Sequence, residues 1–77
     1  MGSKYPVLKP REIIKTLETF GFSYKSQKGS HVKYAKFEKG KLVKTVIIPM
    51  HDEVAKGTFK SILGQAGLTI DEFLLKL

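Results

Sequence analysis

The chain has 77 residues, with 14 lysines and arginines against 7 acidic residues and no cysteine. This length favours one small domain over residues 1–77, and the lack of cysteine excludes disulfides, thiolate metal sites and a cysteine nucleophile. No apolar run approaches the roughly 20 residues that span a bilayer, and the first residues lack the apolar core of a signal peptide. We therefore expect a cytoplasmic protein without a membrane partner.

The N-terminal part predicts a short tail, residues 1–8, followed by a helix. The tail is expected to be tied down by Tyr5, Val7 and Leu8. The helix is predicted from about Pro10 to Phe20, because proline is favoured at the first helical position. Its apolar stripe consists of Ile13, Ile14, Leu17 and Phe20. Gly21 is expected to end the helix, since glycine enters the left-handed conformation without strain.

Three strands are predicted after this helix. Alternating aromatic and polar residues indicate the first strand over residues 22–27, and a turn at 28–30 leads to a second strand over 31–38. Lys39-Gly40 has the residue types of a two-residue hairpin turn. The third strand is predicted over about 42–49 because it is rich in β-branched residues and ends at a proline, which has no N–H.

The hairpin turn also predicts which side chains share a face of the sheet. With a two-residue loop, Lys33 pairs with Val46. One face then carries His31, Lys33, Ala35, Phe37, Leu42, Lys44, Val46 and Ile48. The other face carries Val32, Tyr34, Lys36, Val43, Thr45 and Ile47. We expect the second face to pack on the helices, because burial of the first would leave Lys33 and Lys44 unpaired. His31 would then be open to solvent.

Two more helices are predicted after a polar connection. The first opens at Gly57-Thr58, and Gly67 is expected to cap it, with Leu68 folding back as the hydrophobic contact of the cap. Thr69 and Glu72 have the spacing of a capping box and predict a last short helix. The fold class is therefore predicted as α+β, in the order α-β-β-β-α-α, with a three-stranded antiparallel sheet and the helices on one face.

Positive charge gathers in the middle of the chain. Residues 25–44 contain seven lysines against Glu38, a net charge of +6, which leaves only +1 for the rest. Such clustering is typical of proteins that bind polyanions. A solvated lysine surface that maintains solubility is the alternative. We favour a nucleic acid, because His31 lies inside the cluster.

Histidine is the residue through which this composition can perform catalysis. His31, His51 and Asp52 form the one plausible metal cluster, and their spacing without cysteine is a weak metal pattern. Neither a Gly-x-Ser-x-Gly elbow nor a phosphate loop is present. We therefore expect no metal and no cofactor, which leaves acid–base chemistry.

RNA is the substrate class that suits a lone imidazole. Its 2′-hydroxyl attacks the adjacent phosphorus, so that the protein need only transfer protons near neutral pH and stabilise negative charge. His31 is therefore the candidate catalytic residue; the alternative is an ordinary residue at the start of a strand. The candidate RNA-binding residues are Lys25, Lys28, Gly29, Ser30, Lys33 and Lys44. His51 is a possible second proton-transfer group, although we favour a structural role for it.

An ordered set of short motifs covers nearly the whole chain beyond its first eight residues. It comprises Lys28-Gly29-Ser30-His31-x-x-Tyr34, Val46-Ile47-Ile48-Pro49-x-His51, Lys56-Gly57-Thr58-Phe59 and Ala66-Gly67-Leu68-Thr69. This set resembles the HicA (YcfA-like) mRNA interferase toxins of bacterial toxin–antitoxin systems. Lys33 and Gly64 depart from the family pattern, since a neutral residue and a basic residue are usual there.

The resemblance implies a fold like that of double-stranded-RNA-binding domains and ribosome-independent mRNA cleavage, with the catalytic histidine at His31. It also implies a HicB-type antitoxin that covers the active site and often binds DNA, so that DNA is contacted only through the antitoxin. Three functions remain open. They are a metal-independent endoribonuclease, a non-catalytic RNA-binding module, and a protein whose main role is to bind the antitoxin.

Overall fold

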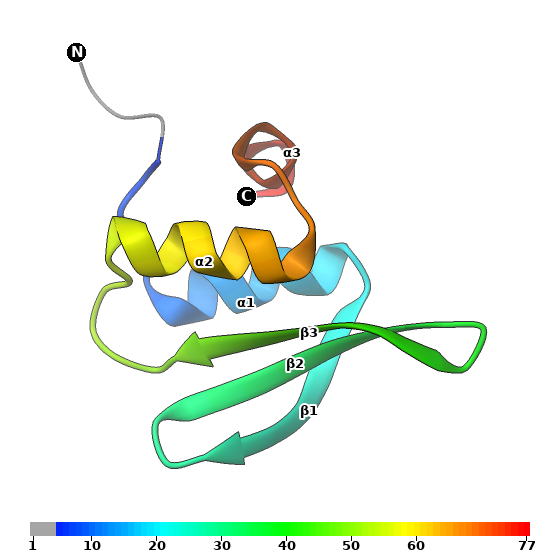
Figure 1. Ribbon diagram of the computed structural model, residues 1–77. Coiled ribbons are helices and arrows are strands. Elements are labelled where there is room, and N and C mark those ends of the chain that lie inside the picture. Colours follow the sequence, from blue (N-terminus) through cyan, green and yellow to red (C-terminus); the bar gives the residue numbers. More distant parts are fainter. Residues whose placement is uncertain (1–4) are drawn as a thin grey trace.

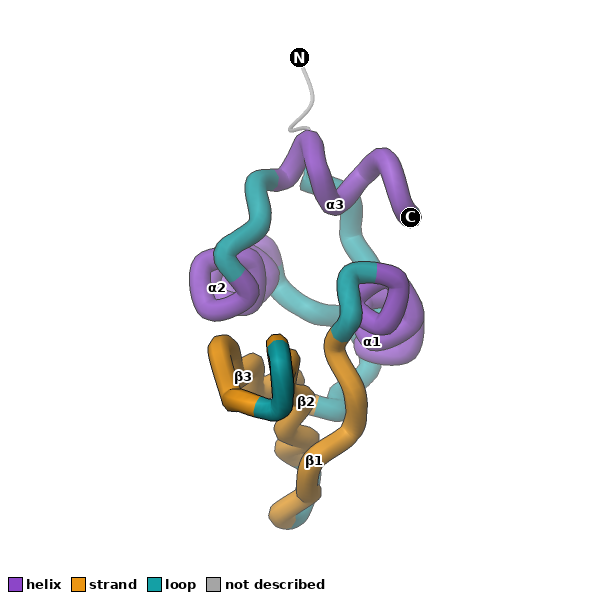
Figure 2. Tube along the Cα trace, turned by 90° about the vertical axis from the view of Figure 1, so that its right-hand side faces the viewer, coloured by secondary structure: helices purple, strands orange, loops and turns teal. Residues whose placement is uncertain are grey.

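The computed structural model describes residues 5–77, in which three helices lie on one face of a three-stranded antiparallel sheet (Figure 1, Figure 2). The elements are α1 (Pro10–Thr19), β1 (Phe22–Lys28), β2 (His31–Glu38), β3 (Lys41–Pro49), α2 (Lys56–Ala66) and α3 (Ile70–Lys76). The strand order is β1-β2-β3. Figure 2 shows α1 and α2 next to the sheet and α3 beyond them. The predicted α+β class and the order of elements are confirmed.

Helix α1 has the ends and the apolar stripe that the sequence predicts. At its start, the backbone N–H of Lys9 donates to the Glu12 carboxylate at 2.8 Å. Ile13 and Leu17 are fully buried, whereas Ile14 and Phe20 pack against the core from partly exposed positions. Gly21 follows with φ of +94°. Each fully buried side chain of this kind contributes roughly 1.5–3 kcal/mol to stability.

The predicted caps of the last two helices are confirmed. Gly67 adopts the left-handed conformation after α2, and the N–H of Leu68 donates to the Leu63 carbonyl at 3.0 Å. In α3, the N–H of Glu72 donates to the Thr69 hydroxyl at 3.1 Å, and the N–H of Thr69 donates to the Glu72 carboxylate at 2.8 Å. These reciprocal bonds satisfy helix-terminal N–H groups that have no partner within the helix.

The segment before α1 is only partly a tail. Leu8 is buried and forms an isolated β-bridge with Val54, and the ring of Tyr5 stands edge-on to Phe59 at 6.2 Å between centroids. The anchoring predicted for these two residues is therefore confirmed. It is wrong for Val7, which is 69% exposed. Residues 1–4 of the predicted tail lie outside the described residues.

The predicted register of the β2–β3 hairpin is correct at the turn and wrong beyond it. Lys39 and Gly40 both have positive φ, and Glu38 pairs with Lys41, as a two-residue loop requires. A bulge at Val43 then adds one residue to β3, so that residue 33 pairs with 47 instead of 46. An added residue exchanges the two faces of a strand. Val46 and Ile48, and not Ile47, therefore join the buried core.

The core between sheet and helices settles which way β2 faces. Val32 and Tyr34 are buried beside the helices, as predicted. The alternate side chains of β2 point to the other side, which carries no helix among residues 5–77. We call this side the open face; on β2 it is formed by His31, Lys33, Ala35 and Phe37, of which Ala35 is itself buried. None of the helices in this part of the chain is long and apolar enough to span a membrane.

The bulge also moves Lys44 to the helix-covered face, contrary to the prediction. Lys44 pairs with Lys36, which shares its face with Val32 and Tyr34. The Lys44 stem lies against the cap of α2, where a Cβ on Gly67 would stand 2.7 Å from its Cε. The stem of Lys36 lies less closely against the end of α1, where a Cβ on Gly21 would stand 3.5 Å from its Cε, and its Nζ lies 5.9 Å from the centroid of the Phe22 ring. A helix C-terminus carries partial negative charge, which stabilises cations placed there.

Candidate active site

His31 lies at the end of the central strand, where the backbone turns from β1 into β2. Gly29 makes this turn possible with φ of +59°, and the space beside its Cα is open. Lys28 on β1 and Pro49 on β3 are the cross-strand neighbours of His31. The imidazole is exposed and belongs to the open face. The solvent access that the sequence predicts for His31 is confirmed.

His51 lies directly beside His31, although the two are twenty residues apart in sequence. The N–H of Met50 donates to the Ser30 carbonyl at 2.6 Å, which fastens the segment after β3 to the β1–β2 turn. The two imidazole rings stand edge-on, with 6.2 Å between their centroids and 87° between their planes. Two imidazoles therefore share one small site.

A groove of about 380 Å³ runs from this histidine pair along helix α2. It is lined by His31, Ile47, Pro49, His51, Thr58, Ser61, Ile62 and Gln65. The Gln65 amide shapes its wall, because its Oε1 accepts from the Ile47 N–H at 3.0 Å and its Nε2 donates to the Ser61 hydroxyl at 3.3 Å. The groove thus combines two imidazoles with hydroxyl and amide groups that can contact a polar ligand.

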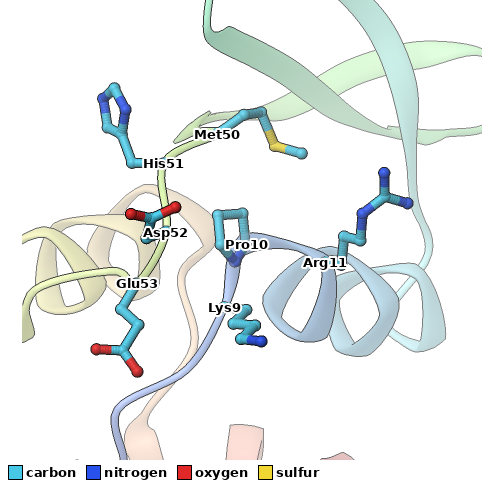
Figure 3. Close-up of a pocket in the computed structure, with 7 residues that line it drawn as sticks. All are labelled: Lys9, Pro10, Arg11, Met50, His51, Asp52 and Glu53. Atoms are coloured by element: carbon cyan, nitrogen blue, oxygen red, sulfur yellow. The ribbon is translucent and has the colours of Figure 1, made fainter.

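A larger hollow of about 620 Å³ lies between the start of α1 and the segment after β3 (Figure 3). Its walls include Arg11 and Met50 together with the acidic residues Asp52 and Glu53. His51 also borders this hollow, and in the close-up its ring points away from Pro10 and Arg11. Lys9 and Arg11 balance the charges of the two carboxylates, so the hollow offers no excess of positive charge to a phosphate. We therefore place the chemistry in the smaller groove, which contains both histidines.

The structure brings together part of the predicted RNA-binding set. Lys28 pairs with His31 across the sheet, Gly29 and Ser30 form the adjoining turn, and Lys33 follows on the same open face. Lys25 is exposed at a bulge in β1. Lys44 lies on the helix-covered face and is separated from this group by the sheet. Of the predicted lysines, Lys28 and Lys33 therefore share the open face with His31.

Tyr34 lies in the core, as predicted. Burial raises the pKa of its phenol, and the negative charge of the Glu18 carboxylate, which also accepts a hydrogen bond from it, raises this pKa further. The phenol therefore stays protonated near neutral pH.

Within residues 5–77 no group of three or more histidine and acidic side chains is placed to hold a metal ion.

Sequence reasoning missed the contribution of α2 to the groove. Thr58, Ser61 and Gln65 recur at intervals of three and four residues, the spacing of one helix face. This polar stripe, which lies beside the apolar stripe of the same helix, is the signal that could have found them. Nothing in the sequence pointed that stripe at His31, since only the packing of α2 against β3 does so.

The fold and the site define a small α+β protein whose sheet ends in a basic turn beside a pair of histidines. A sequence model of the family described as HicA toxin of bacterial toxin–antitoxin matches residues 10–68, most of the chain, from the start of α1 to the cap of α2. The chain therefore belongs to the HicA toxin family. Its members are toxins of toxin–antitoxin systems and generally ribonucleases, and such systems include an antitoxin partner. No curated protein matches the chain.

Proposed function

We propose that this toxin is a metal-independent endoribonuclease that cleaves mRNA without the ribosome, with His31 as its catalytic residue. One observation carries the proposal: the exposed imidazole of His31 lies edge-on to that of His51, 6.2 Å away, at the mouth of a groove. Membership of a family of RNA-cleaving toxins supports it.

The reaction needs only proton transfer and charge stabilisation from the protein. A neutral imidazole takes the proton of the 2′-hydroxyl, whose oxygen forms a bond to the adjacent phosphorus. The bond from phosphorus to the 5′-oxygen breaks, and a protonated imidazole delivers a proton to this leaving oxygen. The products are a 2′,3′-cyclic phosphate and a 5′-hydroxyl. Two neighbouring imidazoles can divide these tasks, so we now assign His51 as the second proton-transfer group.

The surroundings of the histidines suit a phosphate. Lys28 and Lys33 place positive charge on the open face next to His31, where it stabilises the extra negative charge of the transition state. The backbone at Gly29 is unobstructed, so a phosphate oxygen can approach the N–H groups of the turn. These features explain why we place the scissile phosphate between the turn and the histidine pair.

The physiological setting follows from the same assignment. The substrate is mRNA in the cytoplasm, and a HicB-type antitoxin neutralises the toxin by covering the active site. Contact with DNA occurs only through the antitoxin. A non-catalytic RNA-binding module is the alternative function, and the basic residues around His31 would serve it equally well.

Cleavage of a purified transcript in the presence of EDTA tests the proposal. We expect wild-type protein to produce fragments that end in 2′,3′-cyclic phosphate, and the His31→Ala variant to lose at least about 100-fold in rate while it still binds RNA. Lys76→Ala, in α3, is the matched surface control and should cleave normally. Equal cleavage by wild type and His31→Ala would remove the catalytic role of this residue. RNA binding without cleavage by the wild type would establish the alternative.

A further inference from the structure

The outer part of the β2–β3 hairpin extends beyond the helices (Figure 1). Phe37 and Leu42 form a cross-strand pair there on the open face, and they are 50% and 48% exposed. Val43, at the bulge beside them, is 43% exposed. The Phe37–Leu42 pair, half exposed and with the exposed Val43 next to it in the chain, forms an apolar patch that is typical of a protein-binding surface.

The free edge of β3 adjoins this patch. The N–H of Ile47 points outward and is covered by Gln65 of α2. Outward-facing N–H groups recur at every second residue of an edge strand, so that of Thr45 also points away from β2. Among residues 5–77 no group covers the edge at Thr45 as Gln65 covers Ile47. A strand of another protein can therefore pair with β3 here.

Charge decides which occupant fits. Residues 36–44 carry four lysines against Glu38, a net charge of +3. A second copy of this chain would bring an equal positive charge, which disfavours self-pairing. A nucleic acid would satisfy the lysines, but its phosphates would not cover Phe37 and Leu42. An acidic protein segment with apolar side chains satisfies both features.

We propose that an acidic, extended segment of the antitoxin adds a strand to β3 at Thr45 and covers the Phe37–Leu42 pair. This inference rests on the antitoxin partner in the proposed function and adds a second contact surface to the active site that the antitoxin covers. Phe37 lies six residues along β2 from His31, which corresponds to about 20 Å. The docking surface is therefore separate from the histidine groove, and each can be altered without the other.

Isothermal titration of the toxin with the antitoxin encoded beside it tests this surface. We expect the double variant Phe37→Ser/Leu42→Ser to weaken binding about 30-fold or more. RNA cleavage by the free toxin should stay unchanged. Leu75→Ser is the matched control, because Leu75 is 84% exposed on α3, and it should bind the antitoxin like wild type. Circular dichroism confirms that each variant is folded.

Hydrogen exchange of the complex gives a second readout that needs no substitution. We expect the amides of residues 43–46 to exchange at least about tenfold more slowly when the antitoxin is bound. Unchanged affinity in the double variant, or unchanged exchange in this segment, would overturn the proposal, as would loss of RNA binding alone. Both readouts measure antitoxin binding, so they stay distinct from a failure of the ribonuclease assignment, which would show as intact binding without cleavage.

Discussion

The ring of His51 stands edge-on to the ring of His31, with 6.2 Å between their centroids. Two backbone features create this relationship. The antiparallel register places Pro49 opposite His31, and the bond from the Met50 N–H to the Ser30 carbonyl turns the following residue toward the β1–β2 turn. The pair therefore depends on hydrogen bonds of the backbone, so either ring can be removed while the other stays in position.

Removal of the second imidazole should separate catalysis from binding. We expect His51→Ala to lower the single-turnover cleavage rate about 100-fold and to leave the affinity for RNA within about twofold, because one proton transfer loses its donor or acceptor. A cleavage rate equal to that of wild type would show that His51 has a structural role and transfers no proton.

The open-face lysines should account for much of the salt dependence of RNA binding. We expect Lys28→Ala and Lys33→Ala each to reduce the slope of log affinity against log salt by about 0.7, the value for one phosphate contact on single-stranded RNA. Lys44→Ala is the matched control, since this lysine lies on the helix-covered face. An equal effect of all three substitutions would show that RNA contacts lysines on both faces of the sheet.

Substitution by alanine should change stability in opposite directions at two glycines, Gly64 inside α2 and Gly67 at its cap. Gly67 has φ of +71° and lies against the Lys44 stem, so Gly67→Ala should destabilise the fold by about 1–2 kcal/mol. Gly64 lies inside α2, with open space where a Cβ would stand, so Gly64→Ala should stabilise it by about 0.5–1 kcal/mol. Urea denaturation measures both changes, and a shift of the same sign in the two variants would contradict the assignment.

Tyr34 should make stability fall at alkaline pH. Its pKa is raised by burial and by Glu18, so the folded state retains the phenolic proton after the unfolded chain has released it. The resulting stability is present below about pH 10, the ordinary value for tyrosine, and is lost as the pH rises through the higher folded-state value. Unfolding free energies of wild type and Tyr34→Phe between pH 8 and 11 measure this. The gap between the two proteins should shrink above pH 10; a constant gap would exclude the linkage.

The sequence predicted features set by neighbouring residues and missed those set by distant contacts. The caps at Gly67 and Thr69 and the turn at Lys39-Gly40 were predictable, because each depends on the conformational limits of a few residues. The bulge at Val43 was not, since no local residue type requires it. Its cause is global: only the shifted register places Val46 and Ile48 in the core.

The candidate site was half predictable for the same reason. The exposed position of His31 in a basic segment followed from the glycine turn and the alternation of β2. The nearness of His51 and the polar stripe of α2 required the packing of β3 between β2 and that helix. The catalytic roles themselves stay predictions until cleavage by the variants is measured.

Lys36 and Lys44 lie on the helix-covered face of the sheet, each near the end of a helix. The Nζ of Lys36 lies 4.0 Å from the Glu38 carboxylate, and the Lys44 side chain lies beside the cap of α2, so part of the positive charge of the basic stretch is offset within the protein. The formal net charge of +7 therefore overstates the positive charge that is available to a polyanion. We therefore expect a polyanion to approach the side of the sheet that carries Lys28 and Lys33.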